Sequence, residues 1–163
     1  MKLKKISLLF FLTFFFVSYL SSNSDCLKNI GKKFIVVVEG LSGDARKIRL
    51  TRERLKTVTE LKLRKEGMDI RELSDILDTP VVYVNVNVLR EAFNISLCIM
   101  ERVEIQRISF SKFCNATTWS RGTTGMHGND PEFIVSALSG LLDEFLNDYY
   151  KANPKKEVNH GNL

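Results

Sequence analysis

The residues of this chain whose types could do chemistry are few: three cysteines and two histidines. The cysteines are Cys26, Cys98 and Cys114, and the histidines are His127 and His160. A cysteine acts as a nucleophile when a neighbouring base or positive charge favours its thiolate, and neither histidine has a recognisable sequence relation to a cysteine. This favours structural cysteines, while a hydrolase that uses Cys98 or Cys114 stays open as an alternative.

Motifs for metal, phosphate and serine chemistry are weak or absent. The sequence contains no HExxH, no CxxC, no G-x-S-x-G and neither common glycine-rich phosphate loop. His127 with Asp130 and Glu132 could form a weak metal site, but both acids also suit a helix start, where negative charge is favourable. The Ser109–Lys112 segment matches S-x-x-K, yet it falls between expected strands, whereas productive pairs lie on a helix. We therefore expect no metal, no cofactor and no catalytic residue, and the rival is an enzyme built around the glycine-rich loop at His127.

An oxidising compartment would allow two of the three cysteines to pair. Cys26 lies in a polar leader, whereas Cys98 and Cys114 are sixteen residues apart across an expected hairpin. Cys98 and Cys114 are therefore the better candidates for a disulfide, which requires their Cα atoms to come within about 7 Å.

The first 24 residues predict a cleavable secretory signal. Three lysines in the first five residues precede an uncharged run from Ile6 to Leu20. That run would make about 22 Å of helix, shorter than the roughly 30 Å core of a bilayer. Because Ser22 and Ser24 suit a cleavage site, we expect a mature chain that begins at Asp25, has no stable membrane span and is periplasmic or secreted. An uncleaved anchor and lipid attachment at Cys26 are the alternatives.

The mature chain has the size and charge of one ordinary exported domain. Its 139 residues suit a single domain. Because the leader carries three lysines and no acid, 21 bases face 19 acids, a net charge of +2. This balance gives no electrostatic argument for nucleic acid. The segment from Arg46 to Lys65 holds nine bases and two acids, and it either contacts anionic lipid or glycan or is a solvated helix face.

Two helices and a strand hairpin are the clearest elements. Capping residues predict helices over 52–66 and 131–152. Alternating valines predict a strand over 81–89, and a turn at Arg90-Glu91 leads into a second alternating strand. Residues of like character then face each other: Val88 and Phe93, Val86 and Ile95, Val84 and Leu97, Asn87 and Asn94, Asn85 and Ser96.

With further strands at 34–38 and about 113–120, the order becomes β-α-β-β-β-α. Residues 121–129 would form a glycine-rich loop. We expect residues 25–154 to fold as a two-layer α/β (α+β) sandwich, a mostly antiparallel sheet with two helices on one face, followed by a polar tail at 155–163.

The other face of the expected hairpin carries an unusual set of polar side chains: Tyr83, Asn85, Asn87, Asn94 and Ser96. Asparagine is poorly suited to strands, and its donors and acceptors suit binding of a polar surface. Two other interpretations stay open: the asparagines bond to one another across the hairpin, or they lie under residues 68–80.

Several stretches resemble a family of small exported bacterial proteins of unassigned activity. They are the helix start Leu50–Arg54, the segments Glu60–Met68, Tyr83–Val88, Ala116–Ser120 with Gly122, and Asp143–Tyr149. A strand, a helix ending in Arg-Lys-x-Gly and a strand hairpin are also similar to protein-binding periplasmic modules such as the TolB N-terminal domain. The second resemblance implies a domain that binds other proteins. Together with the export signal, the small α/β fold and the lack of a catalytic constellation, it leads us to expect a non-enzymatic envelope module with a protein partner. A small hydrolase and a carrier of a small apolar ligand are the alternatives.

Overall fold

The computed structural model describes residues 23–154, apart from 76–78 and 108–109. Most of the predicted signal peptide and the tail at 155–163 therefore lie outside the described residues. The elements follow in chain order: η1 (Asn23–Leu27), β1 (Lys33–Val38), α1 (Gly43–Lys47), α2 (Arg52–Lys65), β2 (Asp69–Arg71), η2 (Leu73–Asp75), β3 (Val81–Leu89), β4 (Ala92–Arg107), β5 (Phe110–Met126) and α3 (Pro131–Ala152).

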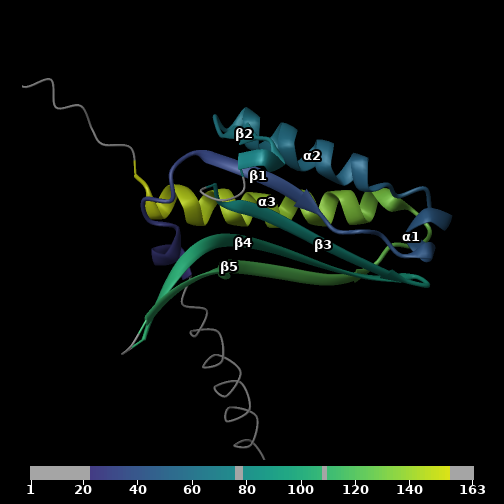
Figure 1. Cartoon of the computed structure of the whole chain (residues 1–163). Helices are drawn as coiled ribbons and strands as arrows, with labels where there is room; N and C mark the ends of the chain where they lie inside the picture. The colour runs from purple at the N-terminus through teal and green to yellow at the C-terminus, as the bar shows by residue number, and fades with distance from the viewer. Residues whose placement is uncertain (1–22, 76–78, 108–109, 155–163) are drawn as a thin grey trace, which may run out of the picture.

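The strands form one five-stranded mixed sheet in the order β2-β1-β3-β4-β5. Strand β1 is parallel to β2 and β3, and the meander β3-β4-β5 is antiparallel. Helices α2 and α3 contact each other and the same sheet (Figure 1). This arrangement confirms the predicted two-layer α/β fold.

Both predicted helices begin at the capping residues that the sequence offers. The Thr51 hydroxyl accepts a hydrogen bond from Arg54 N–H at 3.1 Å, and the Asp130 carboxylate accepts one from Glu132 N–H at 2.9 Å. Gly67 follows α2 with a φ of 77°, a conformation that costs glycine little. Helix α2 thus ends one residue before the predicted boundary, and α3 has the predicted bounds.

The hairpin of β3 and β4 has the predicted turn and register. Leu89 pairs with Ala92 across the turn residues Arg90 and Glu91, and all five predicted cross-strand pairs are present. The alternating valines of β3, which are Val82, Val84, Val86 and Val88, are buried in the core beneath the helices. Matching alternation on both strands fixes the register, because a slip by one residue would turn every valine to the other face.

Strands β4 and β5 extend far beyond their predicted ends, and the predicted loop at 121–129 is largely strand. Two glycines of that segment permit close packing within the sheet. A Cβ on Gly125 would lie 2.8 Å from the Phe93 ring, and one on Gly122 would lie 3.0 Å from the Ile95 carbonyl oxygen. Strand β2 and helix α1, which are short, were not predicted.

The core lies between the sheet and the two long helices. Phe145 of α3 packs edge-on against Phe34, with ring centroids 5.9 Å apart, and against Trp119 at 5.3 Å. The predicted burial of Leu138, Leu141 and Phe145 is confirmed. One apolar cluster runs from Leu27 in η1 to Tyr149 in α3, so the described residues share a single core.

Candidate functional site

The sheet face opposite the helices carries the five residues predicted for binding. Tyr83, Asn85 and Asn87 follow one another along β3, and Asn94 and Ser96 lie beside them on β4. Asn87 and Asn94 are exposed, and the other three are half-buried. We call this surface the open face.

A glutamate that the sequence analysis did not single out connects the polar residues of β3. Glu39, at the end of β1, accepts a hydrogen bond from the Asn85 amide, and Asn87 Nδ2 donates to Asn85 Oδ1 at 2.6 Å. A hydrogen bond from the Tyr83 hydroxyl to Glu39, together with burial, raises the pKa of Tyr83. Glu39 therefore orders three side chains of the open face.

The polar residues of β4 bond in other directions. Asn94 Nδ2 donates to Thr124 Oγ1 of β5 at 3.1 Å, and Ser96 Oγ lies 3.4 Å from Cys98 Sγ on the same strand. The asparagines thus bond along β3 and towards β1 and β5, and no hydrogen bond joins Asn87 to Asn94 across the β3–β4 hairpin among the described contacts. The open face is a row of oriented amides that still present unused donors and acceptors.

A shallow cavity of about 200 Å³ continues the open face beyond Tyr83. Its floor is apolar, and Val37, Val81 and Met100 supply it from three adjacent strands. Arg102, Asn115 and Thr79 add polar groups to its lining. Along β3, the open face therefore changes from apolar at the cavity to polar at the asparagines.

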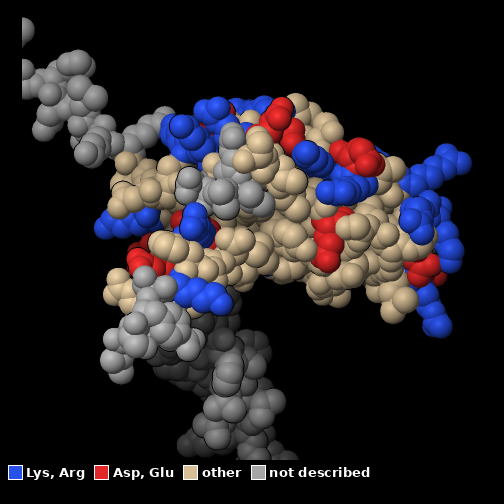
Figure 2. Space-filling view, in the orientation of Figure 1, with Lys and Arg blue, Asp and Glu red and all other residues tan. Residues whose placement is uncertain are grey.

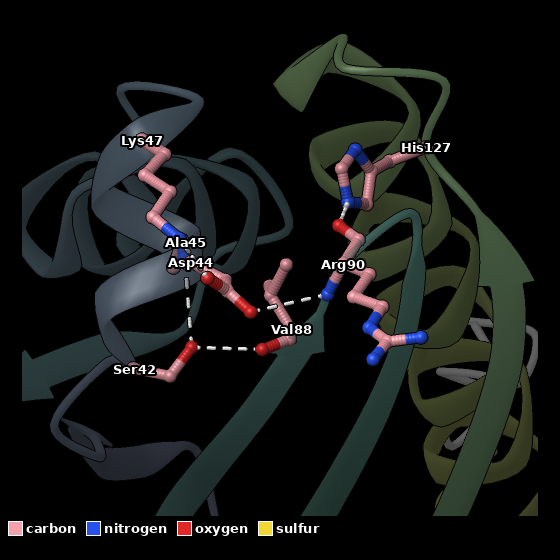
Figure 3. Close-up of polar contacts among 7 residues, drawn as sticks. All are labelled: Ser42, Asp44, Ala45, Lys47, Val88, Arg90 and His127. Carbon is pink, nitrogen blue, oxygen red and sulfur yellow. Dashed lines mark hydrogen bonds and ion pairs between the residues drawn. The ribbon is translucent and has the colours of Figure 1, made fainter.

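His127, the other predicted candidate, has a structural role in the described contacts. The imidazole is fully buried, with Nε2 2.7 Å from the Arg90 carbonyl oxygen and Nδ1 3.1 Å from Asn129 N. A backbone N–H can only donate, so Nδ1 accepts, and the ring proton lies on Nε2 and is donated to Arg90. Both ring nitrogens are thus occupied by the backbone. Figure 3 shows the contact of Nε2 with the Arg90 carbonyl oxygen.

The same turn is held from its other side by α1. Ser42 Oγ donates to the Val88 carbonyl at 2.9 Å, and Asp44 accepts a hydrogen bond from Arg90 N–H at 3.1 Å (Figure 3). A hydrogen bond from Lys47 and the Arg90 N–H hold the pKa of Asp44 below its usual value. These contacts fix Arg90 at a φ of 54°, which a non-glycine residue rarely adopts.

Ser42, Asp44 and His127 therefore lie near one another at this turn, but they do not bind one another. Ser42 and His127 bind backbone groups, and Asp44 binds the Arg90 N–H and the Lys47 side chain. Asp130 caps α3, and Glu132 pairs with Arg54. Among the described residues, no three His, Cys, Asp or Glu side chains gather closely enough to hold a metal ion.

The predicted disulfide needs correction, because the structure does not bring Cys98 and Cys114 together. Cys98 pairs with Ser120, and Cys114 pairs with Val103 on the far side of a register shift. Six strand positions separate Ser120 from Cys114, a distance of about 20 Å. All three cysteines are free. Cys26 does not lie in a separate leader, because it belongs to η1, and η1 packs against α3 and β5.

The sequence matches no protein-family model and no curated protein. Within the described part of the chain, no helix has the length and apolar character needed to cross a membrane. The open face is therefore the candidate site, on the strength of its geometry alone.

Proposed function

We propose that this protein is an exported, non-enzymatic binding module whose open face contacts a protein of the bacterial envelope. The observation that carries the proposal is the ordered row of amides around Glu39, beside an apolar cavity. Side chains that are already hydrogen-bonded lose little freedom on binding, so a partner pays a smaller entropic cost. The leader with its lysines and apolar run supports export.

The size of the cavity favours a protein partner over a small ligand. Pockets for small molecules typically measure roughly 300–1,000 Å³, and this cavity measures about 200 Å³. A single apolar side chain of a partner would suit a recess of this kind, with the polar row around it, as in the anchor-and-rim arrangement of many interfaces. A carrier of a small apolar ligand is the second candidate, and the apolar floor of the cavity supports it.

The double substitution Asn85→Ala with Asn87→Ala tests the proposal. Both side chains are at least partly solvated, so their hydrogen bonds should contribute only about 0.5–1.5 kcal/mol each to stability. We expect the melting temperature to change little and capture of the partner from envelope extract, read by mass spectrometry, to be lost. Asn147→Ala, an exposed asparagine on α3, is the matched control and should retain capture.

Two results would count against this function. A double variant that melts far below the wild type would make the asparagines structural. A small apolar molecule that co-purifies with the protein and is seen by native mass spectrometry would favour the carrier instead.

A further inference from the structure

One end of the molecule, remote from η1, combines exposed cationic and apolar side chains. We call it the arginine end. It is formed by α1, the start of α2, the β3–β4 turn, the start of α3 and the loop that precedes α3 (Figure 1). Figure 2 shows lysine and arginine side chains gathered there, with few acidic ones among them. None of the five predicted binding residues of the open face belongs to it.

The cationic side chains of the arginine end are mostly without acidic partners. Arg46, Arg49 and Arg52 are exposed and form no ion pair with an acid in the described part of the chain, and Arg90 projects from the neighbouring turn. Nearby acids are largely engaged: Asp44 with Lys47, and Glu132 with Arg54. The remaining acids here without an ion pair are Glu53, Glu91 and Asp130, and Asp130 caps α3. Four arginines without an acidic partner thus outnumber three such acids, so the end favours an anionic surface.

Large apolar side chains protrude at the same end. Leu89 and Met126 flank Ala92 in one row across β3, β4 and β5, and they are 71% and 66% exposed. Phe133, in the first turn of α3, is 59% exposed. Single exposed apolar residues are common on soluble proteins, but three of them beside unpaired arginines are typical of a surface that lies in a membrane interface.

We propose that the arginine end docks on an anionic lipid membrane, with the guanidinium groups against lipid phosphates and Leu89 and Met126 inserted among the headgroups. A lipid surface provides both phosphate charge and an apolar layer a few ångströms below it. An acidic protein would satisfy the arginines but leave the protruding Leu89 and Met126 without a place to insert.

The position of the chain start is relevant to this docking. Asn153 holds η1 at the C-terminal end of α3 through hydrogen bonds with Asn29 and Leu27, whereas the arginine end lies at the other end of that helix. Helix α3 has 22 residues and is therefore about 33 Å long. Docking of the arginine end is thus independent of the predicted leader, and it does not rest on the function proposed for the open face.

Vesicle binding by the protein purified after export tests the inference. The probes are vesicles of phosphatidylglycerol and phosphatidylcholine in equal parts, and vesicles of phosphatidylcholine alone. Each arginine near an anionic surface strengthens partitioning about fivefold, so Arg49→Gln with Arg52→Gln should weaken it about 25-fold. Lys33→Gln with Lys65→Gln removes the same charge at the other end and should have far less effect.

Two further variants separate lipid from any other polyanion. Leu89→Ser with Met126→Ser should weaken partitioning about tenfold, because insertion of apolar surface is lost. Leu61→Ser with Leu73→Ser, which are 59% and 60% exposed elsewhere, is the matched control. Glu91→Gln should strengthen binding about fivefold, a gain that a folding defect cannot produce.

A fluorescent reporter makes the result independent of any retained leader. The emission of Leu89→Trp should shift to the blue with the anionic vesicles alone, while that of Leu61→Trp should not. The inference is overturned if Leu89→Trp does not shift, or if the charge variants at the two ends weaken binding equally. It is also overturned if Leu89→Ser with Met126→Ser binds like the wild type while poly-glutamate displaces the protein, because the end is then only a site for polyanions.

Discussion

His127 offers the sharpest test of how the turn between β3 and β4 is held. The variant His127→Phe keeps a ring of similar size in the fully buried site but removes both hydrogen bonds of the imidazole. An unsatisfied buried polar group costs about 1–3 kcal/mol, so two would cost about 2–6 kcal/mol. Arg90 and Asn129 are exposed residues and water can reach their backbone groups, so we expect the lower part of that range, about 2 kcal/mol.

A urea melt measures this loss directly. With a typical slope of about 2 kcal/mol per molar urea, the midpoint of His127→Phe should fall by about 1 M. His127→Gln should recover part of the loss, because its amide can donate to the Arg90 carbonyl. Lys32→Ala, an exposed side chain just before β1 and remote from this turn, is the surface control and should change stability by less than about 0.5 kcal/mol.

The tautomer of His127 is a second, independent readout. Nitrogen-15 NMR of the imidazole should show the proton on Nε2, because Asn129 N–H donates to Nδ1. A proton on Nδ1 would refute the assignment of donor and acceptor. A midpoint unchanged in His127→Phe would refute the conclusion that the imidazole holds the turn.

Two further predictions concern the interface between α3 and the rest of the fold. Leu141→Ala should cost about 2–5 kcal/mol, whereas Asp143→Ala should cost less than about 1 kcal/mol, because Asp143 is 61% exposed and its pair with Lys62 is a surface one; equally mild urea melts would contradict the helix orientation. Burial raises the pKa of Tyr149 above its ordinary value of 10.0, so its stabilising contribution is present below that pH and is lost as pH rises through the raised pKa. Alkaline melts of Tyr149→Phe, followed by circular dichroism, should therefore fall less steeply with pH than those of the wild type.

The parts of the fold that were predictable are those in which local pattern and tertiary burial agree. Valines alternate along β3 because every second side chain contacts the helices, and the same alternation on β4 leaves one register. Thr51 and Asp130 predict the helix starts because their side chains satisfy N–H groups that have no partner within the helix.

The extension of β4 and β5 could not be predicted, because in these parts of the strands no tertiary burial imposes an alternating pattern. Beyond Met100, β4 pairs only with β5 and not with β3, so this arm has no helix layer that requires alternation. Charged residues such as Glu101 and Glu104 therefore interrupt the pattern without interrupting the strand. The misplaced strand ends also explain the predicted disulfide, since the pairing that begins at Arg107 and Phe110 places Ser120, and not Cys114, opposite Cys98.

Within the candidate site, the polar strand residues were predicted, but Glu39, which binds Asn85, was not. Alternation alone puts Asn85 and Asn87 on the face opposite the valines. Glu39 directly follows β1 and lies forty-six residues before Asn85 in the sequence. Only the parallel pairing of β1 with β3 brings Glu39 and Asn85 together. A single acid that follows a buried apolar strand was the one signal in the sequence that could have drawn attention to it.

The two proposed surfaces are compatible because β3 connects them. Strand β3 runs from Val81 at the cavity to Leu89 at the arginine end, eight steps that span about 26 Å. If the arginine end docks on lipid, β3 stands away from the membrane and the open face stays accessible to a partner from the side. Membrane docking would then confine the protein to the surface where an envelope partner is concentrated. The substitutions Asn85→Ala and Leu89→Ser should accordingly affect partner capture and vesicle binding separately, because the two residues lie four positions apart on β3, about 13 Å.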